Sequence, residues 1–560
     1  MLTDQLVQLL RDIHSLPRHL GIHNGGMVLT GGPIADRLPT EPATMPGRVV
    51  VQWDKDALET VGMVKIDILG LRMLSALADA EAIVRAEVDS GFELDQLAFD
   101  DPHVYAMIAR GDTIGMFQVE SRAQAQIQPR LQPRCFNDLV IGISLIRPGP
   151  LQGEMVHPYL RRRAGLEPVT YTHPLLRPAL QETLGVILFQ EQVLKVARDV
   201  AGFTAAQGEQ LRRALGGKLD GVALHALRDQ FLAGAIARDV PADVATTIFG
   251  QLLAFAGYAF PKSHAAAFAV LVYQSAYLKR YHPAAFFAAL LNHQPMGFWP
   301  PAQLVADAKR HGVRVLPVHL ERSTDRCRVR GTAIRLGLRS ISGLGPEGVE
   351  RIVEARRSRP FGDLADLCRR TRLPRRLIEQ LIMVGALDHW GVPRRTLLWR
   401  LGGVDYHEEA LPLPPTLPDV SLPDLSRWER LGWEEQIQGF ALDDHPLAAL
   451  RPMLAERGVL SSRDLLAVPH NLEVCIAGRL VIHQAPPTAK GHQFLTLEDE
   501  HDLINVILRP DVVPTAKQLL HNGALLLVKG IAQHSAGVTN VVATTIQRMT
   551  THETSGKMNM

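Results

Sequence analysis

The segment at residues 64–71 (VKIDILGL) places one carboxylate, that of Asp67, inside a run that is otherwise apolar. Val64, Ile66 and Ile68 recur with a period of two, which is the spacing of a β-strand. A carboxylate on a buried strand is costly unless a cation or hydrogen-bond donors compensate its charge. We therefore expect a buried Asp67 that is either a metal ligand or a structural acceptor, and the residues alone leave both interpretations open.

Short motifs spread along the chain point to one family. They include GIHNGGMV at 21–28, GMFQVESR at 115–122, RPGP at 147–150, FQEQV at 189–193, LRRA at 211–214 and KSHAA at 262–266. In this order they resemble the C-terminal part of the bacterial C-family DNA polymerases, the polymerase III alpha class. Residues 120–124, 157–163 and 294–298 are more similar to the error-prone, translesion branch of that family than to its replicative branch.

The resemblance implies a DNA-directed DNA polymerase, a nucleotidyl transferase of DNA replication and translesion repair. Asp67 corresponds to one of three acids that would hold two Mg²⁺ ions, and the family's other two aspartates and its Gly-Ser motif do not occur in this sequence. A two-metal site needs carboxylates from more than one strand. We therefore expect that the N-terminal half is missing, through a split gene, truncation or decay, or that the start lies upstream of Met1. The isolated chain is expected to be inactive.

Periodicity and resemblance together predict a multidomain α+β protein. A chain of 560 residues with 46% hydrophobic content is long enough for several cores. We expect the second half of a polymerase palm at 1–75, a mostly α-helical fingers domain at 76–330, a tandem helix-hairpin-helix region at 331–402, a Pro-rich linker at 403–424, a helical connector at 425–470, a five-stranded OB-like β-barrel at 471–548 and a disordered tail at 549–560.

The residues Pro261 to His264 favour an anion site. A helical pattern starts at Ala265, so Ser263 is expected to be its N-cap. Lys262 and His264 would then flank a helix N-terminus, whose free N–H groups and positive dipole favour a phosphate. The alternative is an ordinary capped core helix. The resemblance favours the first interpretation and implies that Lys262, Ser263 and His264 bind the triphosphate of an incoming dNTP.

Further nucleotide contacts follow from the resemblance. Arg212 and Arg213 correspond to arginines of a fingers helix that reach the triphosphate, and Lys218 follows them in the glycine-rich segment at 216–218. Arg147 begins a rigid turn with two prolines, which would aim it at a phosphate or only brace the loop. Paired arginines are also common on surface helices that make weak ion pairs.

Glycine turns predict DNA contacts between residues 331 and 402. Gly343 and Gly345 precede one helical pattern, and Gly385 follows another. Such turns let main-chain N–H groups approach DNA phosphates. Residues 339–376 contain ten arginines against five acids, Arg351 among them. This excess of positive charge suits a nucleic-acid backbone, although a solvated helix face is the alternative.

Composition excludes several other classes. The four cysteines have neither metal-ligand nor disulfide spacing, and the sequence shows no signal peptide or membrane span, so a cytoplasmic protein with no membrane partner is expected. The expected partners are primer-template DNA, dNTPs, other translesion polymerase subunits, the sliding clamp indirectly, and a separately encoded N-terminal half. The competing hypothesis is a non-catalytic DNA-binding or mutasome-scaffold remnant.

Overall fold

The structure, a computed structural model, divides into two compact units, Met1–Ser75 and Ala76–Met560. It describes residues 2–14, 21–23, 25–68, 70–146, 152–215, 221–256, 260–406, 418, 420, 422–486, 489–521, 523–535 and 537–549. Arg147, Lys218, most of the predicted linker and nearly all of the predicted tail lie outside these residues.

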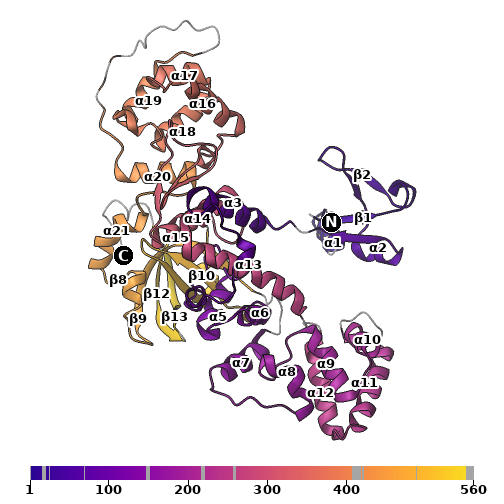
Figure 1. The fold of residues 1–560 in the computed structure, drawn as a ribbon. Helices are drawn as coiled ribbons and strands as arrows, with labels where there is room; N and C mark the ends of the chain where they lie inside the picture. The colour runs from indigo at the N-terminus through magenta and orange to yellow at the C-terminus, as the bar shows by residue number, and fades with distance from the viewer. Residues whose placement is uncertain are drawn as a thin grey trace. The chain divides into compact units, whose positions relative to one another are not determined.

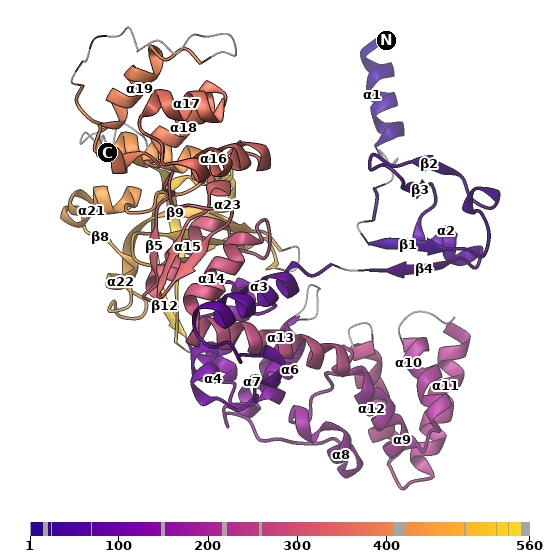
Figure 2. The same ribbon diagram turned by 45° about the horizontal axis from the view of Figure 1, so that its top comes forward.

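The first unit is built from two small antiparallel sheets, two α-helices and one 3-10 helix (Figure 1 and Figure 2). Its elements are α1 (Leu2–Ile13), β1 (Gly26–Leu29), η1 (Ile34–Asp36), β2 (Thr40–Pro42), β3 (Val49–Val51), α2 (Lys55–Thr60) and β4 (Val64–Asp67). β1 pairs with β4 in antiparallel register, so that Gly26 lies opposite Asp67. β2 pairs with β3, and Asp54 caps α2 by accepting a hydrogen bond from the Ala57 N–H.

One face of the β1–β4 sheet is apolar and exposed. Met27 lies opposite Ile66 and Leu29 opposite Val64, so the four side chains share one face. Their exposed fractions run from 43% to 58%. Helix α1 repeats this pattern, because Leu6, Leu9, Leu10 and Ile13 are more than half exposed. A two-stranded sheet has no second layer of its own to cover such a face.

The second unit begins inside helix α3, in a helical region that extends to residue 310 and confirms the predicted helical fingers. Its helices are α3 (Arg72–Glu87), η2 (Leu94–Gln96), α4 (Pro102–Ala109), α5 (Arg122–Leu131), α6 (Phe136–Leu145), α7 (Gln152–Arg163), η3 (Pro174–Leu176), α8 (Arg177–Leu180), η4 (Gln181–Thr183), α9 (Gln190–Ala201), α10 (Ala205–Leu215), α11 (Gly221–Ile236), α12 (Ala242–Ala256), α13 (Lys262–Tyr281), α14 (Pro283–Asn292) and α15 (Pro301–Arg310). Helix α13 packs against α4, α6 and α14.

A helical module with a small sheet follows. The sheet consists of β5 (Arg314–Leu316), β6 (Arg328–Arg330) and β7 (Ala333–Arg335), in the order β5-β7-β6. The helices are η5 (Leu338–Ser340), α16 (Pro346–Ser358), α17 (Leu364–Thr371), α18 (Arg375–Met383), η6 (Asp388–Trp390) and α19 (Arg394–Gly402). Ile352, Leu367, Ile378 and Leu381 are fully buried in it.

The predicted five-stranded barrel is confirmed. After α20 (Arg427–Gln438), α21 (Pro446–Glu456), β8 (Val459–Leu460) and α22 (Ser462–Leu465), it contains β9 (Glu473–Gln484), β10 (Gln493–Glu498), β11 (Leu503–Leu508), α23 (Val513–Ala516), β12 (Leu525–Ser535) and β13 (Val538–Arg548). β9 pairs with both β10 and β12, which closes the barrel, and β8 adds a parallel edge to β9. None of the described helices has the length and apolar character that a bilayer crossing requires.

A buried lysine joins distant parts of the helical region. The Lys279 side chain, on α13, is fully buried, and its Nζ lies 2.7 Å from carboxylate oxygens of both Asp112 and Asp307. It also donates to the Ile114 carbonyl at 3.0 Å. His311 closes the cluster through a 2.8 Å contact with Asp112. The ammonium charge is thus compensated by two carboxylates, which makes its burial tolerable.

Glu120 is a half-buried acid, and its charge is only weakly compensated by Lys279. Burial raises the pKa of this carboxyl to about 7, although the backbone N–H groups of Phe298 and Gly115 oppose the shift. The Phe298 N–H donates to Oε1 at 3.0 Å. Since the pKa is raised in the folded state, folding favours the protonated acid.

We expect Glu120→Gln to change the pH dependence of stability. With the folded pKa of Glu120 above its ordinary value of 4.5, the folded protein binds more protons, so the free energy of unfolding falls as pH rises from 4.5 to about 7. The Gln variant lacks this loss, which amounts to about 3 kcal/mol. Urea unfolding at pH 5 and pH 8 measures it, with Glu87→Gln as a surface control. Identical pH profiles for variant and parent would contradict the prediction.

Arg122 joins the helical region to the barrel. This residue begins α5 and is only 7% exposed. Its Nη1 donates to the carbonyl of Leu495 at 2.7 Å and to that of Val506 at 3.3 Å, on β10 and β11. Its guanidinium also lies over the Phe494 ring. Burial lowers the pKa of Arg122 to about 10.

Loss of the Arg122 side chain should loosen β10 and β11. Arg122→Ala leaves two barrel carbonyls without their donor, at a cost of about 1–3 kcal/mol for each buried group. We expect faster amide hydrogen exchange at residues 493–508, with the helices α9 to α12 unchanged. Arg130→Ala, at the exposed end of α5, is the matched control. If both variants exchange like the parent, the α5 contact does not stabilise the barrel.

Candidate nucleotide and nucleic-acid sites

Two helix N-termini lie side by side in the second unit. Phe189 and Phe260 form an isolated parallel bridge, in which the Gln190 N–H donates to the Phe260 carbonyl at 2.9 Å. Helix α9 begins at Gln190 and helix α13 at Lys262, each directly after this bridge. The buried Gln192 side chain fixes the loop before α9 by accepting from the Leu188 and Phe189 N–H groups. The positive ends of two helix dipoles therefore meet in one place.

The start of α13 differs from the prediction. The helix begins at Lys262 after Pro261, so Ser263 lies inside its first turn and is not the N-cap. The Lys262 N–H donates to both carboxylate oxygens of Glu191 at 3.0 Å. A carboxylate from the neighbouring helix therefore takes the place that the serine was expected to fill. Ser263 and His264 are exposed.

Three of the predicted cations in this region, Lys262, Arg212 and Arg213, are already paired with acids. Lys262 forms an ion pair with Glu182, and its Nζ also lies 5.6 Å from the centre of the Phe189 ring. Arg212 and Arg213 both contact Glu209, at 2.7 and 3.1 Å. Hydrogen bonds from these two arginines lower the pKa of Glu209 to about 2. These acids were not predicted as members of the site.

The structure nevertheless brings the predicted residues together. Arg212 Nη1 lies 3.4 Å from the Gln190 side-chain oxygen, while Lys262 contacts Glu191, the next residue along α9. His264 lies between two aromatic rings, with ring centres 5.4 Å from Phe260 and 4.2 Å from Phe268. A region with two helix N-termini, two cations and an exposed aromatic edge can bind an anion that carries a planar base, provided that the anion displaces the internal acids.

Asp67 is exposed, which corrects the prediction of a buried acid. Half of its side chain is accessible, and it ends β4 in the first unit. Lys65 Nζ lies 2.5 Å from Oδ1, and this hydrogen bond lowers the pKa of Asp67. His23 Nδ1 lies 3.8 Å away. The apolar sequence around Asp67 misled the prediction because Val64 and Ile66 are exposed as well.

The residues around Asp67 do not fit a two-ion site by themselves. Mg²⁺ prefers carboxylate and other oxygen ligands, whereas Asp67 is paired with a lysine and a histidine. Within the described residues, one group of three acids and histidines has metal-ligand spacing, formed by Asp112, Asp307 and His311. Lys279 fills that group with its own positive charge. Neither place is therefore a magnesium site as it stands.

The two predicted glycine turns differ in access. A Cβ added at Gly345, the N-cap of α16, would meet no atom within 4 Å, and Gly343 has a positive φ of 80°. At Gly385 a Cβ would meet Arg394 at 2.2 Å and Asp388 at 2.6 Å. The turn before α16 is therefore open to a ligand, whereas the turn after α18 is partly covered by an ion pair. Arg351 is exposed and donates to the Arg372 carbonyl at 3.2 Å.

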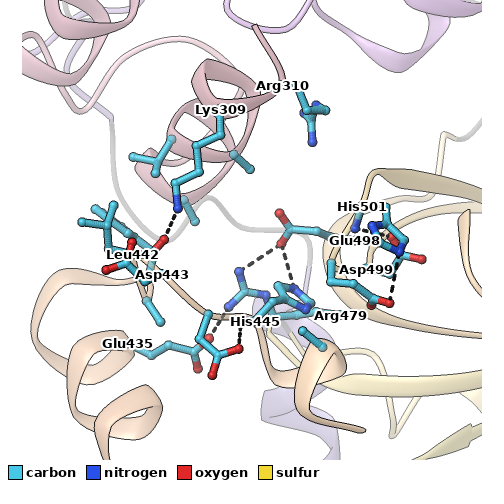
Figure 3. A pocket seen from close by; sticks show the side chains of 18 of the residues that line it. Lys309, Arg310, Glu435, Leu442, Asp443, His445, Arg479, Glu498, Asp499 and His501 are labelled. Carbon is cyan, nitrogen blue, oxygen red and sulfur yellow. Dashed lines mark hydrogen bonds and ion pairs between the residues drawn. The ribbon is translucent and has the colours of Figure 1, made fainter. Parts of the chain in front are cut away.

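A cavity of about 540 Å³ lies between α15, the segment that connects α20 to α21, and the barrel (Figure 3). Its charges neutralise one another. Arg479 contacts Glu435 at 2.7 Å and Glu498 at 3.0 Å. His445 and Arg479 lower the pKa of Glu498 to about 2, although burial opposes this shift. The ion pairs that line the cavity therefore hold the barrel against the helices.

Comparison with family models defines the class of this chain. The model of the bacterial DNA polymerase III alpha NTPase domain matches residues 2–70, that of the bacterial DNA polymerase III alpha subunit finger domain matches residues 73–239, and a helix-hairpin-helix motif matches residues 312–397. The chain belongs to the C family of bacterial DNA polymerases, the polymerase III alpha type, and within it to the error-prone branch.

Individual relatives support the branch. The error-prone DNA polymerase of Mycobacterium tuberculosis is 45% identical over 560 residues, covering 98% of this chain and 50% of the relative. That of Anaeromyxobacter dehalogenans is 43% identical over 556 residues, covering 95% and 49%. The chain thus spans about half the length of these relatives. The solved Stn1–Ten1 complex of S. pombe is similar over 15% of this chain at 12% identity, with a TM-score of 0.13 that supports no inference.

The pairing of Glu209 with two arginines leads to a test of the anion site. Glu209→Gln frees Arg212 and Arg213, so we expect binding of inorganic tripolyphosphate to strengthen about twofold to fivefold, the range of an exposed ion pair. Isothermal titration calorimetry measures the affinity. The control is Glu167→Gln, which frees Arg161 and Arg162 by the same change of charge elsewhere in the helical region. Equal gains in both variants would mean that only net charge matters.

Proposed function

We propose that this chain supplies the nucleotide-binding and DNA-binding parts of an error-prone DNA polymerase, which performs DNA-templated nucleotidyl transfer during translesion synthesis. The observation that carries the proposal is the meeting of the α9 and α13 N-termini beside Lys262 and Arg212. The incoming dNTP would bind there, with its phosphates at the helix ends. Ser263 and His264 lie on α13, Arg213 lies beside Arg212 on α10, and these three residues would complete the contacts. Arg147 and Lys218 remain proposed from the resemblance alone.

Primer-template DNA would be bound by the hairpin module. The open turn of Gly343 and Gly345 supports backbone contacts with phosphates, and Arg351 would add a charge nearby. The OB-like barrel follows this module along the chain, after the segment that contains α20, α21 and α22. The cytoplasm, where bacterial DNA lies, is the proposed location.

The first unit would be the second half of a polymerase palm that needs a further polypeptide segment. Two features of this unit support this. The exposed apolar faces of the β1–β4 sheet and of α1 would be covered by such a segment. Asp67 would share divalent ions, proposed to be Mg²⁺, with carboxylates of that segment, because its present neighbours do not fit a metal pair. Other translesion subunits, and the sliding clamp through them, are proposed partners of the assembly.

The absence of a fitting two-ion group in the described residues also favours a second candidate function. In that case the chain would be a DNA-binding or scaffold protein derived from a polymerase, without catalysis of its own. The two functions differ in whether added polypeptide restores synthesis.

We expect the purified chain to bind primer-template DNA and to leave the primer unextended with Mg²⁺ and dNTPs, because one carboxylate cannot organise two ions. Adding a polypeptide equivalent to the remaining half of the relatives should restore extension. Asp67→Asn should then abolish extension and spare DNA binding, whereas Asp36→Asn, the same charge change in the first unit, should spare both. Gel-based primer extension measures the activity. Failure of the complemented parent to extend would favour the scaffold function.

A further inference from the structure

The small sheet of the hairpin module presents arginines on one face. In β6 and β7, Arg328 lies directly opposite Arg335, and Arg330 lies opposite Ala333. Residues two apart in a strand point to the same side, so Arg328, Arg330 and Arg335 share one face while Val329 and Ile334 are buried on the other. In β5, which pairs in parallel with β7, Arg314 lies opposite Ala333 and so belongs to the same face. We call these four residues the arginine face.

Carboxylates do not compensate the arginine face. Across the part of the chain that the structure describes, no acid forms an ion pair with any of its four members, in contrast to the paired arginines elsewhere. Arg335 donates to the Pro317 carbonyl at 3.0 Å, which leaves its charge in place. The acids of the adjoining loop are engaged elsewhere, since Asp325 pairs with Arg339 and Glu321 accepts from the Phe361 N–H.

The positive charges on this face repel one another. Burial lowers the pKa of Arg335, and the neighbouring charges of Arg322 and Arg330 lower it further. Burial and the nearby His389 lower the pKa of His319 to about 4, with Arg322 and Arg335 adding to the shift. Like charges directly opposite each other on two strands are destabilising. The face therefore reduces stability in the free protein, and an anion that binds it would remove that cost.

We propose that the arginine face binds the phosphate backbone of DNA, as a contact surface separate from the glycine turns. This proposal rests on the proposed function as a DNA-binding polymerase part. Guanidinium groups bind phosphate oxygens with two parallel hydrogen bonds. The chain leaves β7 at Arg335 and reaches the open turn of Gly343 eight residues later, and both lie within the segment that matches the helix-hairpin-helix motif. The arginine face and the glycine turn would then offer two sets of phosphate contacts within the same module.

The test compares two charge-matched triple variants of the full chain. R328Q/R330Q/R335Q removes three charges from the arginine face, and R85Q/R198Q/R427Q removes three exposed arginines that pair with acids elsewhere. Fluorescence anisotropy with a primer-template duplex gives the affinity over a series of KCl concentrations. Each lost phosphate contact reduces the slope of log affinity against log salt by about 0.9. We expect the face variant to lose about 2–3 in slope and more than tenfold in affinity at low salt.

Further measurements separate this role from a structural one. The face variant should melt no lower than the parent, because like-charge repulsion is relieved, and R328K/R330K/R335K should keep most of the salt slope. A salt slope equal to that of the control variant would overturn the proposal while leaving DNA binding by the hairpins intact. Polyglutamate that competes as well as DNA of equal charge would also overturn it. If the parent binds no DNA, the proposed function fails together with this inference.

Discussion

The buried ammonium of Lys279 determines how the helical region is arranged. This charge is tolerated only where Asp112, Asp307 and the Ile114 carbonyl meet it, so α13, the segment after α4, and α15 must come together around it. Helix α13 has 20 residues, roughly 30 Å of helix, and its other end carries the candidate nucleotide site. Helix α13 thus connects the buried charge cluster around Lys279 to its own exposed N-terminal end. Positioning of Lys262 and His264 depends on packing far from either residue.

Internal ion pairs set the electrostatic character of this protein more than its net charge does. With a formal net charge of +2, positive and negative residues are nearly balanced, and the structure places many of them against each other. Glu191 and Glu209 neutralise the groups that would attract a triphosphate, and Glu435 and Glu498 neutralise Arg479 at the barrel. The four arginines of the β5–β7–β6 sheet differ from the more numerous paired arginines, because no acid in the described residues forms an ion pair with them. Their charge is therefore available to an external anion.

Periodicity in the sequence was sufficient for the elements that bury one face against a core. The five barrel strands and the helical fingers follow from it, because alternate residues of strands such as 493–498 and 503–508 are apolar and reach the same interior. These residues are Leu495, Leu497, Ile504, Val506 and Leu508. The same reasoning failed for residues 64–68. Their alternation is real and β4 forms, but the two-stranded sheet offers no layer to bury them, so Asp67 and its neighbours are exposed. Local pattern predicts a strand and says nothing of what covers it.

Contacts between residues far apart in the chain could not be predicted from the sequence. Ser263 was expected to cap α13, yet the capping group is the Glu191 carboxylate, 71 residues away, because the Phe189–Phe260 bridge brings it there. Glu209 was in principle accessible, since it lies three and four residues before Arg212 and Arg213 on one helix, where such pairs form. The contact of Arg212 with Gln190 was not accessible in this way, and neither was the anchoring of Arg122 in β10 and β11.

The exposed apolar face of the β1–β4 sheet also bears on how this chain behaves during its own synthesis. The face is a short apolar surface on a two-stranded sheet, formed by Met27, Leu29, Val64 and Ile66. Surfaces of this kind promote strand pairing between chains and aggregation. While such an apolar surface is exposed, it resembles that of an unfolded chain, which chaperones and proteases bind. Under the proposed assembly, the amount of this chain that accumulates in a cell would depend on the supply of the covering segment as much as on its own expression.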